Sequence, residues 1–238
     1  MKGETGLDAS RATIDVRRAS FEHVRREHVP LDILARHARS LHPDFTALWL
    51  FRRQFTVHLA AAALVTYALG LNKASAHALK IVGNTGALVP WEMAFSLDAQ
   101  GVLVPSDRVP FRLTPTLVNF SSPVGVSGIF TGCLVAGAAA LDDPEMPIGD
   151  HVAIILRDEI LSWSQSAGGT SGGSGVCRTL DNDVLVAKIR QNVDSMARRL
   201  ATITSDISGG GVGVEQLIKN ATATGNLCLM SPMWHPWL

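Results

Sequence analysis

Two long stretches without a single Asp, Glu, Lys or Arg constrain this 238-residue chain more than any other feature. They cover residues 55–71 and 124–141. Each falls slightly short of the roughly 20 residues that span a bilayer, and each is rich in weakly apolar Ala and Gly. The second contains the step Gly128 to Gly132, a spacing that pairs helices in lipid. We expect two buried core helices without stable membrane insertion. A membrane protein built on these stretches is the alternative.

The overall charge argues against a protein that coats nucleic acid or an anionic membrane. The chain has 21 basic and 21 acidic residues, so we expect no direct nucleic-acid binding. Hydrophobic residues make up 47% of the chain, which is enough to bury a core. The three cysteines are widely spaced and form no Cys-x-x-Cys pair, so neither a zinc site nor a disulfide framework is predicted. The charged N-terminal segment has no apolar stretch of the signal-peptide type.

The chain is predicted to be mainly α-helical with one small β-hairpin. Residues 79–82 and 87–91 are β-like runs, and they flank Gly83-Asn84-Thr85-Gly86, a good hairpin turn. Helical patterns cover residues 20–40, where Pro30 marks a helix start, and residues 46–71, 116–120, 128–141 and 147–164.

The last third of the chain begins with a Gly/Ser-rich linker at residues 165–182. No Gly-Lys-Ser/Thr follows the glycines, so a phosphate-binding loop is not expected. Residues 183–207 then show the most regular apolar spacing in the chain, at Val186, Ile189, Val193, Met196, Leu200, Ile203 and Ile207. This narrow seam fits either a coiled-coil dimer or a helix docked on the rest of the protein. Docking is favoured, because the seam is only about three heptads long and the opposite face is partly basic.

The C-terminal sequence resembles a FATC domain, the short module that closes the phosphatidylinositol-3-kinase-related kinases. The matching pieces are Val214-Glu-Gln-Leu-Ile-Lys-Asn-Ala221, Asn226-Leu-Cys228 and Met233-Trp-His-Pro-Trp-Leu238. Upstream pieces resemble the C-lobe of the same kinases, in the same order and spacing: Phe51-Arg-Arg-Gln-Phe55, Tyr67-Ala-Leu-Gly-Leu71 and Val109-Pro-Phe-Arg-Leu-Thr114. The resemblance implies a PI3/PI4-kinase-like C-lobe without its N-lobe, followed by a FATC helix and an aromatic tip. The expected structural or interaction residues are Phe111, Arg112, Leu113, Leu217, Ile218, Trp234, Pro236 and Trp237.

The resemblance, together with the composition and periodicity of the last third, divides the chain into five expected segments. They are a polar helical segment at 1–42, a degenerate kinase C-lobe at 43–164, the linker at 165–182, a docking helix at 183–207 and the FATC domain at 208–238. Residues 1–45 contain neither a glycine-rich phosphate loop nor a Val-Ala-Ile-Lys-like strand. The chain is therefore expected to be a C-terminal portion of a larger protein.

The catalytic residues of the family are replaced in this chain. The kinase catalytic loop reads Gly-Asp-Arg-His-x-x-Asn, whereas residues 72–78 read Asn-Lys-Ala-Ser-Ala-His-Ala. Lys73 thus stands at the catalytic Asp position and Ala78 at the metal-binding Asn position. Glu92-Met93-Ala94 stands where the metal-binding Asp-Phe-Gly is expected. Phosphoryl transfer depends on metal ions and a positioned Asp, so the resemblance implies a pseudokinase with no catalytic residue, no metal and no cofactor.

One branch of the family combines these features, namely the TRRAP-like pseudokinases. Resemblance to it implies a nuclear scaffold in SAGA-type and MYST-type histone acetyltransferase complexes. Its expected partners are acetyltransferase complex subunits and transcription activators. A fragment of a divergent, active serine/threonine kinase of the same family is the alternative. The substitutions at Lys73, Ala78 and residues 92–94 favour the pseudokinase.

Overall fold

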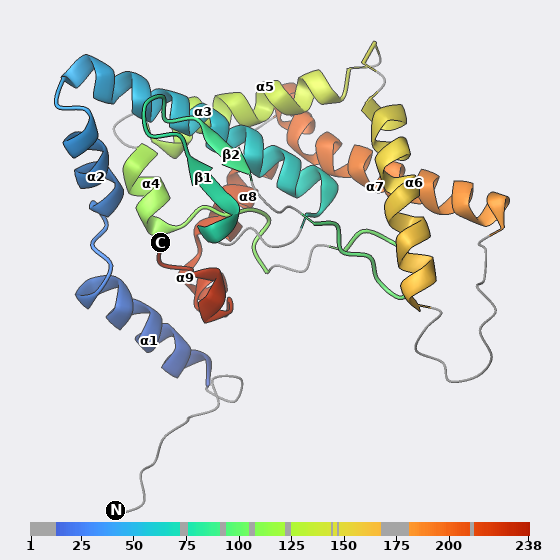
Figure 1. Ribbon diagram of the computed structural model, residues 1–238, viewed down its shortest axis with the longest axis horizontal. Helices are drawn as coiled ribbons and strands as arrows, with labels where there is room; N and C mark the ends of the chain where they lie inside the picture. The colour runs from blue at the N-terminus through green and yellow to red at the C-terminus, as the bar shows by residue number, and fades with distance from the viewer. Residues whose placement is uncertain are drawn as a thin grey trace, which may run out of the picture.

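The computed structural model describes residues 13–71, 76–90, 94–104, 108–121, 125–143, 145–146, 148–167, 181–209 and 212–238. Helix α3 (Phe45–Leu69) runs through its centre and contacts elements from both halves of the chain (Figure 1). The Asp44 carboxylate caps the start of this helix by accepting a hydrogen bond from the Ala47 N–H at 2.8 Å. Gly70 ends it in the left-handed conformation, with φ of 61°.

The other described helices are α1 (Ile14–Glu27), α2 (Ile33–Leu41), α4 (Pro115–Ser121), α5 (Thr131–Leu141), α6 (Ile148–Ala167), α7 (Asn182–Gly209), α8 (Val212–Thr222) and α9 (Thr224–Leu227). Helices α2, α4, α5 and α7 contact α3 directly, whereas α6 and α8 pack on α7, α9 packs on α8, and α1 packs on α9. Short helical turns complete them at η1 (Ala76–Ala78), η2 (Val126–Phe130) and η4 (Pro232–Trp234). The largest fully buried side chains of the main core include Phe55, Leu59, Phe111, Leu113, Phe120, Phe130, Leu134, Leu156, Ile160, Leu200 and Ile203. The core therefore joins α3–α7 and the segment before α4.

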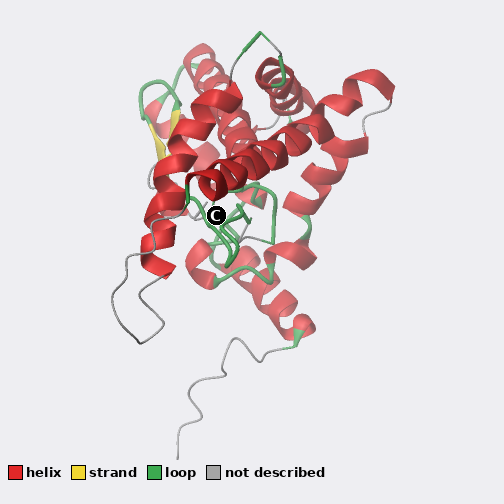
Figure 2. Ribbon diagram, turned by 90° about the vertical axis from the view of Figure 1, so that its right-hand side faces the viewer, coloured by secondary structure: helices red, strands yellow, loops and turns green. Residues whose placement is uncertain are grey.

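Strands β1 (Leu79–Ile81) and β2 (Leu88–Pro90) form the predicted hairpin, with Lys80 opposite Val89. Figure 2 shows them as a small addition at one edge of a body made of helices. Gly86 closes the turn with φ of 77°, and a Cβ at this position would lie 2.3 Å from the carbonyl oxygen of Phe51. Glycine is required here both for the backbone conformation and for the close approach of the hairpin to α3. The prediction of a mainly helical fold with one hairpin is confirmed.

The first uncharged stretch behaves as expected, because most of its side chains in α3 are buried. The second is kinked, since Gly128 leaves the helical conformation (φ −103°, ψ −111°) inside η2. Among the described helices, none is long and apolar enough by itself to cross a bilayer. Only α4 taken together with η2 and α5 meets the length and composition required, and those two parts are bent by 88°.

A different glycine from those singled out in the sequence brings α5 close to α3. A Cβ on Gly137 would lie 2.8 Å from the Leu64 side chain, whereas one on Gly132 would meet no atom within 4 Å. The Gly128–Gly132 step is therefore not the helix contact. Gly137 takes that role because it faces the central helix.

Helix α7 lies against α3, α5 and α6, which agrees with the docked interpretation of its seam. Met196, Leu200 and Ile203 are buried as predicted. At the start of the helix, however, Leu185 is buried and Val186 is exposed. The predicted seam is therefore shifted by one residue there.

A polar residue inside this seam, Asn192, is fully buried. Its side-chain oxygen accepts a hydrogen bond from the Leu103 N–H at 2.7 Å, and its amide group donates to the carbonyls of Gly101 and Lys188, both at 3.0 Å. One side chain thus ties α7 to the loop at residues 101–103.

Replacing Asn192 by alanine is expected to lower the free energy of unfolding by about 1–3 kcal/mol, because buried backbone groups lose their partners. Denaturant unfolding measures the change. The exposed neighbour Gln191 provides the control, since Gln191→Ala should shift the stability by less than about 0.5 kcal/mol. Equal effects of the two substitutions would show that the Asn192 hydrogen bonds do not stabilise the docked helix.

Candidate functional site

Arg112 connects the loop before α4 to the C-terminal end of the chain. Its side chain is 4% exposed. Its guanidinium donates hydrogen bonds to the backbone oxygens of Trp234 at 2.6 Å, His235 at 2.8 Å and Leu238 at 2.5 Å. The guanidinium carbon also lies 4.3 Å from the centroid of the Trp234 ring, in cation–π geometry. The planar, five-donor guanidinium suits this multiple contact better than an ammonium group would.

The residues on either side of Arg112 enter the main core. Phe111 and Leu113 are fully buried, and the Phe111 ring lies 6.0 Å from that of Phe130. Successive side chains of an extended segment point in opposite directions. Phe111 and Leu113 therefore fix this segment in the core, while Arg112 reaches the C-terminal end.

Residues 231–238, called here the C-terminal tip, form a tight turn that presents its carbonyls to Arg112. Ser231 caps η4 by accepting a hydrogen bond from the Met233 N–H at 3.3 Å. His235 follows in the left-handed conformation, with φ of 53°. Trp234 and Pro236 are buried and Trp237 is half-buried. The predicted tip residues thus gather at Arg112.

The tip belongs to a second apolar cluster, separate from the main core. Its buried members are Phe21, Val109, Leu227, Cys228, Met230 and Trp234, with Leu229 and Trp237 at its edge. The predicted residues Leu217 and Ile218 lie instead on α8, half-buried against the main core. The structure therefore distributes the predicted structural residues over two clusters that Arg112 bridges.

Phe21 is the member of this cluster that sequence reasoning missed. It is the buried residue of helix α1, and α1 contacts α9. Its one local signal is a large aromatic side chain within an otherwise polar helix. That signal shows that Phe21 needs burial, but it does not show that the partner lies about 200 residues further along the chain.

Residues 76–78, the described part of the loop that is predicted to be degenerate, approach the same tip. Ala78, the residue predicted to stand at the metal-binding Asn position, is 7% exposed within η1 and has no side-chain atom able to bind a metal. His77 is exposed, and its ring lies edge-on to that of His235, with 5.1 Å between the centroids. Ala94 is half-buried. Lys73, Glu92 and Met93 lie outside the described residues. Across the described part of the chain, no cluster of three or more His, Cys, Asp or Glu could hold a metal ion.

Two half-buried arginines position the segments around this loop. Arg199 donates to the carbonyls of Ala68 and Leu103, both at 3.2 Å, at the C-terminal end of α3. Arg52 donates to the Phe120 carbonyl at 2.9 Å, at the end of α4. Cations are favourable at helix C-termini, where carbonyls lack helical partners. Burial is the main cause that lowers the pKa of each guanidinium below its ordinary value.

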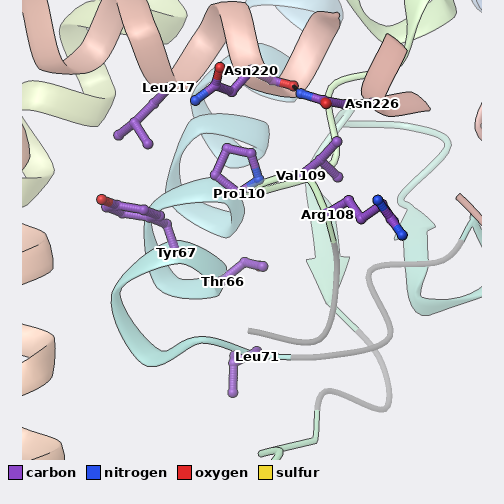
Figure 3. Close-up of a pocket in the computed structure, with 9 residues that line it drawn as sticks. All are labelled: Thr66, Tyr67, Leu71, Arg108, Val109, Pro110, Leu217, Asn220 and Asn226. Atoms are coloured by element: carbon purple, nitrogen blue, oxygen red, sulfur yellow. Dashed lines mark hydrogen bonds between the residues drawn. The ribbon is translucent and has the colours of Figure 1, made fainter. Parts of the chain in front are cut away.

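A pocket of about 370 Å³ lies between the end of α3, residues 108–110 and the C-terminal helices. Figure 3 shows Thr66 and Tyr67 on one side of Pro110, and Asn220 and Asn226 on the other. The Asn226 side chain donates to the Asn220 carbonyl at 2.9 Å. The lining includes one charged side chain, Arg108, and neither a carboxylate nor an imidazole. These residues therefore supply no general base of the kind that hydroxyl activation uses.

Residues 6–165 match the family model described as phosphatidylinositol 3- and 4-kinase. The chain belongs to this kinase family. Its fold is also similar to a solved structure: the one described as the FAT and kinase domain of CtTel1 superimposes with a TM-score of 0.63 at 19% identity. That alignment covers 97% of this chain and 15% of the other.

Several curated relatives within the phosphatidylinositol 3- and 4-kinase family resemble almost the whole chain. The Transformation/transcription domain-associated protein of Homo sapiens is 32% identical over 234 residues, which cover 96% of this chain. The SAGA complex/NuA4 acetyltransferase complex subunit TRA1 of Saccharomyces cerevisiae is 26% identical over 239 residues, which cover 91%. The chain spans 6% of the length of each of these two relatives. The predicted resemblance to the TRRAP-like branch of the phosphatidylinositol-3-kinase-related kinases is thereby confirmed.

Proposed function

We propose that this chain is the C-terminal pseudokinase and FATC portion of a scaffold subunit of histone acetyltransferase complexes. It acts by holding protein contacts and does not transfer phosphate. Two relatives carry names that place them in SAGA and NuA4 acetyltransferase complexes, and the similarity to them covers more than nine-tenths of this chain. The proposed site of action is therefore the nucleus, with acetyltransferase complex subunits and transcription activators as partners.

The buried methyl group of Ala78 is the observation that carries the non-catalytic part of this proposal. Kinases of this type stabilise the transferring phosphoryl group with metal ions, which are held by an Asn and an Asp, while a catalytic Asp accepts the hydroxyl proton. Ala78 cannot bind a metal, and burial leaves its position inaccessible. By the family pattern, Lys73 replaces the catalytic Asp. Its ammonium group is not a base at neutral pH.

A divergent, active kinase is the second candidate function. It is favoured by the similarity to the serine/threonine-protein kinase ATM of Arabidopsis thaliana, which is 24% identical over 202 residues and covers 80% of this chain. Both the identity and the coverage are lower than for the acetyltransferase complex subunits. An active kinase of this family would also need metal ligands that Ala78 cannot provide.

Calorimetric titration with Mg-ATP separates the two candidates. We expect no saturable heat, because the metal and phosphate ligands of an active kinase are replaced. A Glu92→Gln variant is the matched control, since Glu92 is the remaining carboxylate at the Asp-Phe-Gly position. A micromolar dissociation constant for the unaltered chain, weakened in the Glu92→Gln variant, would overturn the pseudokinase proposal and support a functional metal site.

A further inference from the structure

The outer side of helix α3 is apolar along most of its length. The row of residues four positions apart consists of Phe45, Trp49, Arg53, Val57, Ala61 and Val65. Phe45 is 83% exposed and Trp49 is 47% exposed, while Val57 is half-buried. Leu50 adds another half-exposed side chain beside the row, and Leu41 lies close by at the end of α2. Contiguous apolar surface of this kind marks interaction sites on soluble proteins.

The aromatic end of this row carries positive charge. The Arg53 guanidinium lies 5.8 Å from the centroid of the Trp49 ring. Arg39 on α2 lies near enough to Arg52 for its charge to lower the pKa of that guanidinium, after the larger effect of burial. Within the part of the chain that the structure describes, Arg39 and Arg53 pair with no carboxylate. Both side chains are exposed.

The two carboxylates that lie nearest to Arg39 in the sequence already have partners. Asp32 forms an ion pair with Arg36 at 3.1 Å, and Asp44 caps the start of α3. The surface made of Arg39, Leu41, Phe45, Trp49, Leu50 and Arg53, called here the α3 corner, therefore has apolar area and unneutralised positive charge together. Figure 1 shows the two elements that carry it, where the end of α2 leads into the start of α3.

The geometry of this row of side chains on α3 indicates which kind of partner surface would fit it. Side chains four residues apart form a ridge on a helix, and such ridges fit the grooves of a second helix. Arg39 and Arg53 would face acidic groups on the polar side of that helix. A second copy of this chain would bring two positively charged corners together, which is unfavourable. An anionic bilayer is disfavoured because the whole chain has no net positive charge.

We propose that the α3 corner binds an amphipathic helix of a partner protein, which places aliphatic or aromatic side chains against Phe45 and Trp49 and carboxylates against Arg39 and Arg53. The inference deepens the proposed scaffold function, since it gives that scaffold a defined contact surface. Trp49 is the central residue of the contact because it combines a large apolar area with a neighbouring guanidinium.

The test uses the full chain and a fluorescently labelled helical peptide of about 18 residues, roughly five turns. One face of the peptide carries Leu and Phe, and the other carries Glu. Fluorescence anisotropy should show saturable binding that weakens as salt is added. Trp49→Ala should weaken binding by about tenfold or more. Arg53→Glu should weaken it similarly, and should improve binding of a second peptide in which every Glu is replaced by Lys.

Ile154, which is 68% exposed on α6, provides the matched control. Ile154→Ala should leave peptide binding unchanged, and circular dichroism should show all variants folded, since each change is on the surface. Equal binding of the acidic and basic peptides, or binding insensitive to Trp49→Ala, would overturn the proposal. So would Trp49-dependent dimerisation, or Trp49-dependent binding to phosphatidylserine vesicles without peptide binding. The anisotropy assay contains neither nucleotide nor acetyltransferase subunits, so its failure is distinct from failure of the proposed function.

Discussion

Replacing Arg112 by leucine is expected to release the C-terminal tip and to lower the free energy of unfolding by about 3–5 kcal/mol. The buried guanidinium donates to three backbone oxygens of the tip, and hydrogen bonds to charged groups contribute about 1.5–3 kcal/mol each. The expected loss is smaller than the sum of these contributions, because the released oxygens form hydrogen bonds with water. Urea unfolding, followed by tryptophan fluorescence, measures the loss.

Arg112→Lys and Arg198→Leu are the informative comparisons for this experiment. A lysine keeps the positive charge but cannot reproduce the planar fork, so Arg112→Lys should fall between the original chain and Arg112→Leu. Arg198 is exposed on α7, and among the described residues it donates only to the Asp194 carbonyl of its own helix, at 3.3 Å. Arg198→Leu should therefore change stability by less than about 0.5 kcal/mol. If Arg112→Leu unfolds at the same urea concentration as the unaltered chain, Arg112 does not anchor the tip.

Periodic patterns explain why most elements could be predicted from the sequence. The hairpin is specified by Gly83 and Gly86 between two β-like runs, and it forms as expected. The uncharged stretch of α3 is apolar on most sides, and such a helix is stable when it is buried. Its central position therefore follows from its composition. In α7 the apolar seam is correct from Met196 to Ile203, while the side chain of Ile207 lies outside the described residues. At the N-terminal end, Leu185 replaces Val186 because neighbouring helices, rather than spacing alone, determine which side is covered.

Long-range contacts are the part that the sequence did not reveal. Phe21 packs with the tip across more than 200 residues, and nothing in its local pattern identifies that partner. Asn192 interrupts an apolar seam, yet its hydrogen-bond partners are backbone groups of residues 101–103, which carry no side-chain signal. The importance of Arg112 could be inferred only from a family motif. The hydrogen bonds of Arg112 become apparent only in the structure, which places three backbone oxygens around its guanidinium.

The sequence also does not reveal how deeply each of the two tryptophans of the tip is buried. The sequence shows two large aromatic residues that need burial, separated by His235 and Pro236, and it does not indicate which is better covered. In the structure Trp234 is 5% exposed and Trp237 is half-buried. Trp234 is covered by the second apolar cluster and by the Arg112 guanidinium, which lies against its ring, whereas Trp237 lies at the edge of that cluster.

Trp234→Ala is therefore expected to be the most damaging single change in the tip, at about 3–5 kcal/mol. Removing the last five residues should cost at least as much, which is a large share of the roughly 5–15 kcal/mol that stabilises a domain. Met233 is the matched control, because it precedes Trp234 and is 74% exposed. Met233→Ala should leave the melting temperature nearly unchanged, and Trp237→Ala should fall between the two.

In cells, the loss of Trp234 should reduce co-purification of the full-length protein with histone acetyltransferase subunits, since a detached tip destabilises the proposed scaffold. Met233→Ala should co-purify normally. A Trp234→Ala variant that melts normally and assembles normally, but binds lipid vesicles less, would show that the tip is a lipid contact and not a structural element.

A double substitution tests whether Arg112 and Trp234 stabilise the fold as one unit. If either single change already detaches the tip, the second removes contacts that no longer exist, and the two losses should not add. We expect Arg112→Leu with Trp234→Ala to cost at least about 1 kcal/mol less than the sum of the single changes. Strict additivity in urea unfolding would contradict this coupling. It would mean that Trp234 is stabilised by the cluster around Phe21 and Leu227 independently of Arg112, and that the loop before α4 and the C-terminal tip fold without reference to each other.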